Sequence, residues 1–280
     1  MNSETIKAVS DTVAHGDSGG SSSSWMMHHI MDARTLDFEP FGVIHLPELH
    51  LFGYDISITK HVIFIWLAAV ILMVTLSIAA KAYKKSLVPK GMTNFFEILI
   101  VFVRDEIVKP TIGKGYEKFL PFLLTVFFFI LTMNFLGLVP YGSTATSNIG
   151  VTATLAIIAF IVIQGGGIIQ NGFFGYFKGL IPHGVPIPLI PIMFVIEILG
   201  LFTKPFALAV RLFANMTAGH VVILSLIGLI FILKTYFVSP VSVGFALFIY
   251  LLEILVALIQ AYIFTMLSSL FIGMAVHQEH

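Results

Sequence analysis

Residues 204–226 read KPFALAVRLFANMTAGHVVILSL, an apolar stretch with a single arginine, Arg211, near its middle. A charged side chain at the centre of a membrane helix costs about 2.5–3.5 kcal/mol on insertion scales, so such side chains face a polar cavity or a partner. No carboxylate stands three or four residues from Arg211 in the sequence. The stretch therefore predicts a membrane helix whose arginine is balanced by another helix, a water-filled cleft or another subunit.

The composition of the whole chain is that of a polytopic membrane protein. Of 280 residues, 58% are hydrophobic and 11% are charged, which is too little charge for a soluble domain of this length. The formal net charge is zero and no basic patch stands out, so nucleic acid is not expected as a partner. Cysteine is absent, which excludes disulfides and cysteine-ligated metals, and no metal or cofactor is expected.

Hydropathy divides the chain into a polar, flexible N-terminal arm over residues 1–60 and a single membrane domain over 61–280. Lysines cluster after the first apolar segment, in KAYKK at 81–85, so the positive-inside rule places that loop in the cytoplasm. The N-terminus is then outside, the C-terminus is cytoplasmic, and a bacterial inner membrane fits. The expected fold is an all-α membrane protein with spans at about 62–80, 119–138, 149–169, 191–233 and 241–276, and an amphipathic or re-entrant helix at 94–112.

The last two apolar segments are unusually long. At about 1.5 Å per residue they would measure roughly 64 Å and 54 Å as helices, against a hydrocarbon core about 30 Å thick. A short connection, KTYFVSP at 234–240, joins them. Each segment must therefore either break or lie strongly tilted, beyond the usual range of about 0–40°. We expect a long, strongly tilted helical hairpin, a shape suited to a wall beside a partner rather than to a simple pore.

Polar side chains recur on the first long segment at helical spacing. Glu197, Lys204 and Arg211 are seven residues apart, so they share one face of a helix. Small residues on that face let another helix approach Arg211 closely. The residues expected to line it are Ala207, Ala214, Asn215 and Ala218.

The second long segment carries Glu253 and Gln260, which are stacked on one face by the same spacing. A glutamate in an apolar helix can carry a proton, and so can His220, on the opposite face of the first segment from Arg211. Each residue also has a simpler interpretation. Arg211 can form a salt bridge to Glu253 that ties the hairpin, His220 can be a packed interface histidine, and Gln260 can make an ordinary interhelical hydrogen bond.

Three motifs together resemble subunit a of F-type ATP synthases. They are NFLGLVPYG at 134–142, KPFALAVRLFANMTAGH at 204–220 and EILVALIQAYIFTMLSSLFI at 253–272, and the similarity runs in order from about residue 60 to the C-terminus. The resemblance implies a stator subunit beside a rotating ring of c subunits, held by b-type peripheral stalk subunits within the complex. It implies no catalytic activity of the chain on its own.

The resemblance also assigns roles to individual residues. Arg211 matches the essential arginine of the family, and Asn215 and Gln260 match its polar neighbours facing the ring. His220 and Glu253 occupy two positions where members carry a glutamate and a histidine in either arrangement. Glu197 matches a carboxylate facing the cytoplasm or matrix.

One departure concerns the loop before the fourth span, where many bacterial members have an acidic residue and an asparagine. Here the stretch is SNIGVT, with Asn148 as the only polar candidate of that kind. Proton uptake on the outer side is therefore expected to rely on His220, Glu253 and water, with Asn148 as a further candidate.

Three other functions compete with this one. A self-contained secondary ion transporter would be expected to show an internal repeat, which we do not find. An intramembrane hydrolase using His220 and Glu253 lacks a nucleophile or a metal set, and HExxH is absent. A purely structural scaffold would need Arg211 for stability alone.

Overall fold

The structure is a computed structural model that describes residues 58–85, 91–139, 142, 144–179, 186–233 and 239–277, together with four short strands. The strands form two antiparallel hairpins, β1 (Thr35–Phe38) with β2 (Gly42–His45) and β3 (His50–Leu51) with β4 (Tyr54–Asp55). Hydropathy alone does not predict them. The remainder of the expected arm over 1–60 lies almost entirely outside the described residues.

Five helices in the described part of the chain are long and apolar enough to cross a membrane. This confirms the prediction of an all-α, multi-pass membrane protein. Helices suit this role because each satisfies its own backbone hydrogen bonds in lipid. The five are α3 (Lys60–Lys85), α6 (Leu120–Leu138), α7 (Ile149–Asn171), α9 (Ile190–Leu233) and α10 (Ser239–Val276).

The segment expected to be amphipathic is continuously helical but contains a change of helix type. It consists of α4 (Met92–Phe102), the π-helical turn η1 (Val103–Val108) and α5 (Lys109–Ile112). Val103 and Ile107 are fully buried, while Arg104 and Asp105 form a partly exposed salt bridge of 2.8 Å. In η1 the buried side is therefore apolar and the exposed side polar, whereas α4 also exposes apolar side chains such as Phe95 and Ile98. The segment is not among the membrane-long helices of the described chain.

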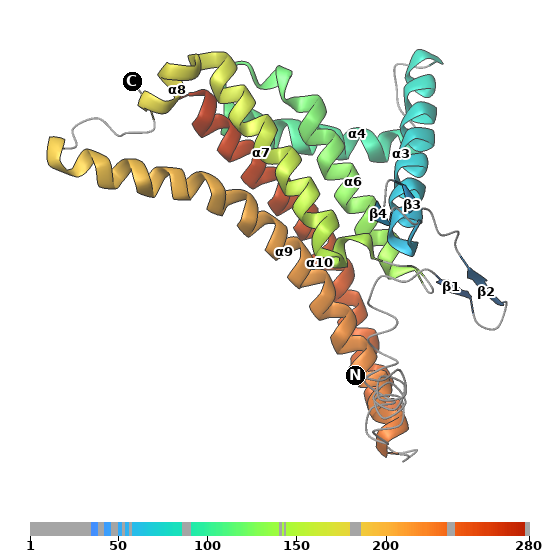
Figure 1. Ribbon diagram of the computed structural model, residues 1–280. Helices are drawn as coiled ribbons and strands as arrows, with labels where there is room; N and C mark the ends of the chain where they lie inside the picture. Colours follow the sequence, from blue (N-terminus) through green and yellow to red (C-terminus); the bar gives the residue numbers. More distant parts are fainter. Residues whose placement is uncertain are drawn as a thin grey trace, which may run out of the picture.

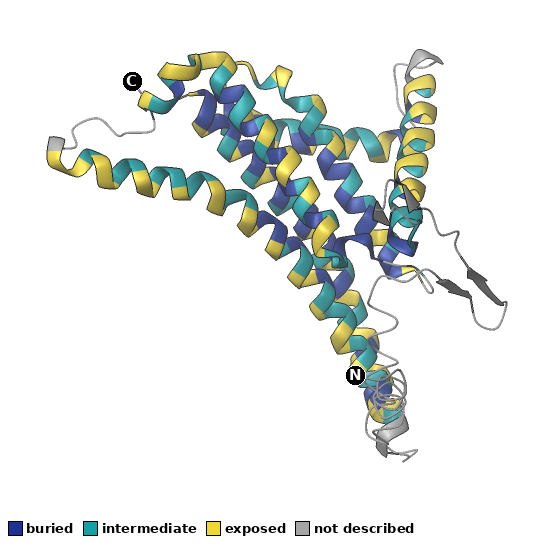
Figure 2. Ribbon diagram, viewed as in Figure 1, coloured by how far each residue is buried: buried dark blue, intermediate teal, exposed yellow. Residues whose placement is uncertain are grey.

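The buried residues gather where α6, α7 and α10 pack together (Figure 2). Gly166 and Gly167 lie within α7, and a Cβ at Gly167 would come within 2.5 Å of the Tyr176 ring. These glycines therefore serve close packing and do not end the helix. α7 ends at Gly172, whose φ is +73°, and the short helix α8 (Phe173–Gly179) follows.

The hairpin of α9 and α10 is the longest feature of the fold. The two helices contain 44 and 38 residues. They run side by side at the lower end of Figure 1, where α10 is straight and α9 bends away toward the left. Pro205 lies inside α9, where it removes one backbone hydrogen bond and so favours bending. The first third of α9 consequently diverges from the bundle.

Candidate functional site

A buried contact between two ionisable side chains joins the two long helices. His220 of α9 places Nδ1 3.4 Å from Oε1 of Glu253 on α10. The Glu253 side chain is 3% exposed, and its carboxylate oxygens accept no hydrogen bond within the described residues. Burying an ionised carboxylate this way is costly unless it is paired, so the charge of Glu253 depends on the proton state of His220.

The glutamate fits because its neighbour on α9 is a glycine. A Cβ at Gly219 would lie 2.7 Å from Oε1 and 2.9 Å from Cδ of Glu253. Any larger residue at this position would push against the carboxylate. We refer to His220, Glu253, Gly219 and Thr144 as the histidine–glutamate cluster.

Thr144 joins this cluster from the loop before α7. Its side-chain hydroxyl and His220 Nε2 are hydrogen-bonded, and Thr144 is 4% exposed. The loop is held in place by Asn134, which is fully buried on α6. Asn134 Oδ1 accepts a hydrogen bond of 2.7 Å from the Thr146 hydroxyl, and its Nδ2 donates to the Ala257 carbonyl at 3.4 Å. The imidazole thus has a carboxylate on one side and a fixed hydroxyl on the other.

Arg211 is half-buried and makes no hydrogen bond or salt bridge within the described part of the chain. The salt bridge to Glu253 that the sequence left open is therefore not present, since Glu253 contacts His220 instead. One turn further along α9, Asn215 Nδ2 donates a 2.8 Å hydrogen bond to Gln260 Oε1 on α10. This bond ties the hairpin together beside the arginine.

The face of α9 around Arg211 is open to the surroundings. Leu208 and Leu212 are buried against the bundle, whereas the small residues of the other face are exposed. Large apolar side chains such as Phe206 and Val210 are exposed beside them. The exposed small residues are Ala207, Ala214 and Ala218.

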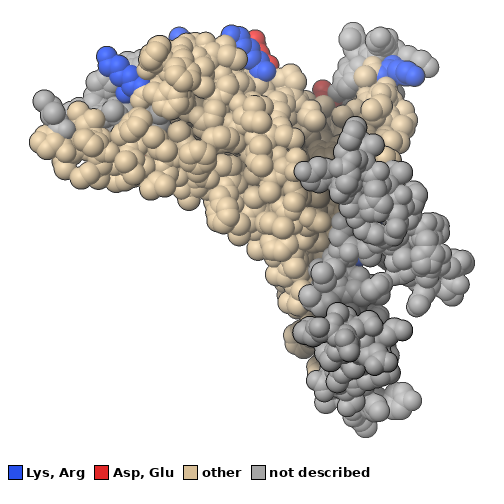
Figure 3. Space-filling view, viewed as in Figure 1, with Lys and Arg blue, Asp and Glu red and all other residues tan. Residues whose placement is uncertain are grey.

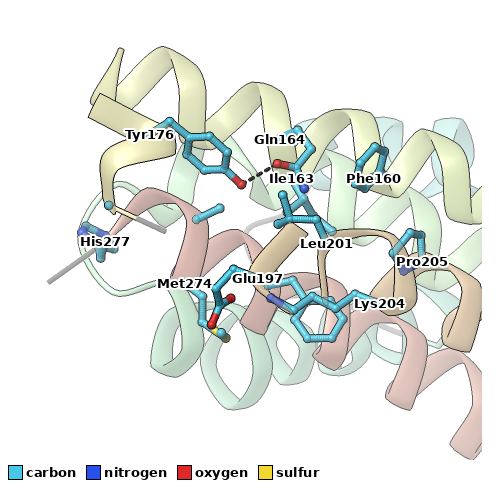
Figure 4. A pocket seen from close by; sticks show the side chains of 13 residues that line it. Phe160, Ile163, Gln164, Tyr176, Glu197, Leu201, Lys204, Pro205, Met274 and His277 are labelled. Carbon is cyan, nitrogen blue, oxygen red and sulfur yellow. Dashed lines mark hydrogen bonds between the residues drawn. The ribbon is translucent and has the colours of Figure 1, made fainter. Parts of the chain in front are cut away.

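A pocket of about 380 Å³ lies where α9 diverges from α7, α8 and the end of α10. Figure 4 shows Glu197, Leu201 and Lys204 of α9 facing Gln164 of α7 and Tyr176 of α8 across it. We call this the Glu197 pocket. Unlike the histidine–glutamate cluster, it is a cavity with room for water.

Two contacts shape this pocket. The Tyr176 hydroxyl donates a hydrogen bond to Gln164 Oε1, and burial raises the pKa of Tyr176, so the phenol stays protonated and able to donate. The Lys204 ammonium lies 5.2 Å from the centre of the Phe271 ring, a cation–π contact. Glu197 is half-buried, and no partner for its carboxylate is found among the described residues.

The Glu197 pocket and the histidine–glutamate cluster lie on opposite sides of Arg211 along α9. Glu197 precedes Arg211 by fourteen residues, which is roughly 21 Å of helix, and His220 follows it by nine, roughly 14 Å. Groups able to exchange protons thus occur before and after a fixed positive charge.

Asn148, the further candidate for proton uptake, lies at the start of α7. Its Oδ1 accepts a 2.8 Å hydrogen bond from the Gly150 backbone, which makes Asn148 the N-cap of α7. Thr144, four residues earlier, is the member of this loop that contacts His220.

Sequence reasoning also missed Asn134, Gln164 and Tyr176. Asn134 had a usable signal, because an amide in an uncharged apolar helix needs a partner. Gln164 in α7 carried the same signal, but its partner Tyr176 did not, because their proximity results from the turn at Gly172. Among the described residues, no cluster of three or more His, Asp or Glu side chains could hold a metal ion.

Fold and site together define a multi-pass α-helical membrane protein with ionisable side chains on either side of an arginine in a long hairpin. The chain matches the family model of the ATP synthase A chain over residues 62–273. It therefore belongs to that family. Membership makes it a component of an ATP synthase and does not favour a self-contained transporter.

Bacterial relatives support the same assignment. The chain is 57% identical over 258 residues to ATP synthase subunit a of Chloroherpeton thalassium, covering 91% of this chain and 77% of the relative. It is 58% identical over 254 residues to ATP synthase subunit a 2 of Chlorobaculum tepidum, covering 89% and 72%. The subunit a of an Anaeromyxobacter species is 44% identical over 312 residues, covering 96% and 76%.

Proposed function

We propose that this chain is the proton-translocating subunit of an F-type ATP synthase and forms two offset half-channels beside a ring of c subunits. Each c subunit would supply one buried carboxylate, which is not part of this chain. The chain itself would catalyse no reaction. Its other partners would be b-type peripheral stalk subunits and the remainder of the complex.

The histidine–glutamate cluster would form the outer half-channel. His220 and Glu253 lie within 3.4 Å of each other and both can exchange a proton, so a proton entering from outside can pass between them. Thr144 would fix the imidazole ring. Asn215, which is exposed, would present its amide toward the ring of c subunits, and the buried Gln260 would hold that amide in place by accepting its hydrogen bond.

The Glu197 pocket would form the inner half-channel. A c-subunit carboxylate that has taken up a proton is neutral and can rotate through lipid without the penalty of a buried charge. On reaching the pocket it would release the proton toward Glu197 and water.

Arg211 would separate the two half-channels. A guanidinium remains protonated in proteins, so it can stabilise an ionised carboxylate transiently without passing a proton on. Proton flow would then require rotation, driven by about 2.3 kcal/mol per charge for each 100 mV of membrane potential. The exposed Ala207, Ala214 and Ala218 would let the ring approach Arg211 closely.

The distribution of charge supports an orientation. Lys and Arg side chains gather mainly along the upper edge of Figure 3, the edge near the C-terminal end in Figure 1. The positive-inside rule would turn that edge, with the Glu197 pocket, toward the cytoplasm, leaving the N-terminus outside. All the relatives compared above are bacterial, which fits a bacterial inner membrane.

The observation that carries this proposal is that Arg211 has no internal partner within the described residues while proton-exchanging groups lie on both sides of it. Arg211→Lys tests it, because a buried lysine can lose its proton whereas an arginine does not. We expect coupled ATP synthesis in membrane vesicles to be abolished. Arg104→Lys, the same substitution at a partly exposed arginine outside both proposed half-channels, is the control and should retain synthesis. Wild-type synthesis by Arg211→Lys would overturn the assignment.

A further inference from the structure

A second cavity, of about 790 Å³, lies outside the proposed ion path, between the start of α6, the second half of α7 and the end of α10. Most of its wall is apolar and is formed by side chains such as Phe119, Phe122 and Val162. Gly165 also lines it, and a Cβ built there would meet no atom within 4 Å. The cavity thus has unfilled apolar volume along α7.

The mouth of the cavity is basic. Lys114 and Lys118 line it, both are exposed, and neither has a salt bridge within the described residues. His277 closes the same end, where its Nε2 lies 3.1 Å from the Lys114 carbonyl oxygen. No acidic residue of the described chain lines the cavity, and the nearby Glu117 is exposed and outside it.

The position of the cavity matches the boundary between the polar and apolar layers of a bilayer. Lys118 precedes the membrane-long helix α6 by two residues. Ile161 and Ile169 line the cavity on α7 and are 62% and 85% exposed, so one wall is continuous with the apolar outer surface. A molecule bound here would have one end at headgroup depth and the other among acyl chains.

We propose that this cavity binds one phospholipid with an anionic headgroup. The phosphate lies between Lys114 and Lys118, and an acyl chain fills the apolar groove past Gly165. Basic pockets between membrane helices on the cytoplasmic side are suited to anionic headgroups. A purely apolar helix from another subunit would leave the two ammonium groups without counter-charge, so charge complementarity favours the lipid.

The test uses the purified complex in phosphatidylcholine vesicles with a small fraction of photoactivatable phosphatidylglycerol. After illumination, the label should map to peptides containing Phe122 and Ile161. It should exceed by about tenfold the label from a photoactivatable phosphatidylcholine with the same tails, because each lysine near an anionic headgroup strengthens binding.

Two variants remove the two halves of the site. The double variant Lys114→Gln, Lys118→Gln should abolish the preference for phosphatidylglycerol. Gly165→Leu should abolish labelling by both lipids, because its side chain enters the open volume without a backbone clash. The controls are Lys178→Gln, an exposed lysine outside the cavity, and Gly244→Leu, another helical glycine with open space around it. Both controls should label as the unmodified complex does.

Equal labelling by the two lipids, or labelling that the variants leave unchanged, would overturn the proposal. So would benzoylphenylalanine in place of Ile161 if it crosslinked to another polypeptide instead of to lipid. None of the substituted residues lies in the proposed half-channels, so failure here would leave the proposed function standing.

Discussion

The two polar regions of the hairpin differ in packing more than in chemistry. In the histidine–glutamate cluster, Glu253 is 3% exposed and a glycine leaves it just enough room. In the Glu197 pocket, a carboxylate faces about 380 Å³ of open volume. Both regions contain a glutamate. The carboxylate of Glu253 is packed beside His220, whereas the carboxylate of Glu197 borders a cavity where water can solvate it.

This difference implies that the histidine–glutamate cluster and the Glu197 pocket tolerate substitution unequally. A tightly packed, buried polar pair depends on accurate geometry, because an unpaired charge in a low dielectric is costly. A hydrated pocket can replace a lost side-chain group with water at small cost. Substitutions in the histidine–glutamate cluster should therefore lower proton pumping more than substitutions in the Glu197 pocket.

Within the two polar regions, the largest effect is expected at Gly219. In Gly219→Ala the new methyl group would lie 2.7 Å from Glu253 Oε1, so the carboxylate has to move away from His220. Overpacking costs about 1–3 kcal/mol, so ATP-driven proton pumping should fall by about tenfold or more. Gly228→Ala on the same helix meets no atom within 4 Å and should pump normally. Equal pumping by both variants in intact complexes would show that proton transfer does not depend on the close packing of Glu253 against Gly219.

A smaller effect is expected at Thr144. Thr144→Val keeps the shape of the side chain but removes the hydrogen bond to His220 Nε2. One such bond contributes about 1 kcal/mol, so pumping should fall by about fivefold. Thr144→Ser keeps a hydroxyl and should recover most of the rate. If serine and valine behaved alike, the hydroxyl would have no part in positioning the imidazole.

The smallest effect is expected in the Glu197 pocket. Glu197→Gln removes a carboxylate that borders open volume, and ordered water can take over much of its role. Proton pumping should change by less than about twofold. A loss as large as that of Gly219→Ala would mean that the pocket is not water-filled and that the contrast between the regions is mistaken.

The fold was predictable because hydropathy, segment length and lysine position all indicate where the chain enters and leaves the membrane. The long hairpin followed from comparing helix length with bilayer thickness, and the observed helices of 44 and 38 residues confirm it. The pairing of His220 with Glu253 could not follow from spacing, since it depends on how two separate helices are set against each other. Segment length left open whether α9 breaks or lies strongly tilted, and it does not locate the bend, which the structure places near Pro205 (Figure 1).

Loops account for most of what the sequence did not reveal about the site. Asn148 is polar and stands in the right loop, but its side chain is used to cap α7. Thr144 reaches His220 because Asn134 and Thr146 hold the loop against α6. Tyr176 and Gln164 meet because the chain turns back at Gly172. The contacts of Thr144 and Tyr176 are set by tertiary packing, which no local pattern encodes, whereas the Asn148 cap joins residues two apart in the sequence.

The proposal that Arg211 separates two half-channels is tested most directly in vesicles carrying Arg211→Ala. Two quantities are measured: ATP-driven proton pumping, and passive proton leak after the catalytic head has been stripped away. If Arg211 separates two half-channels, pumping is lost while the complex remains assembled, and the stripped membranes leak more than unmodified ones. Normal pumping without added leak would contradict the account and reduce Arg211 to a residue needed for structure alone.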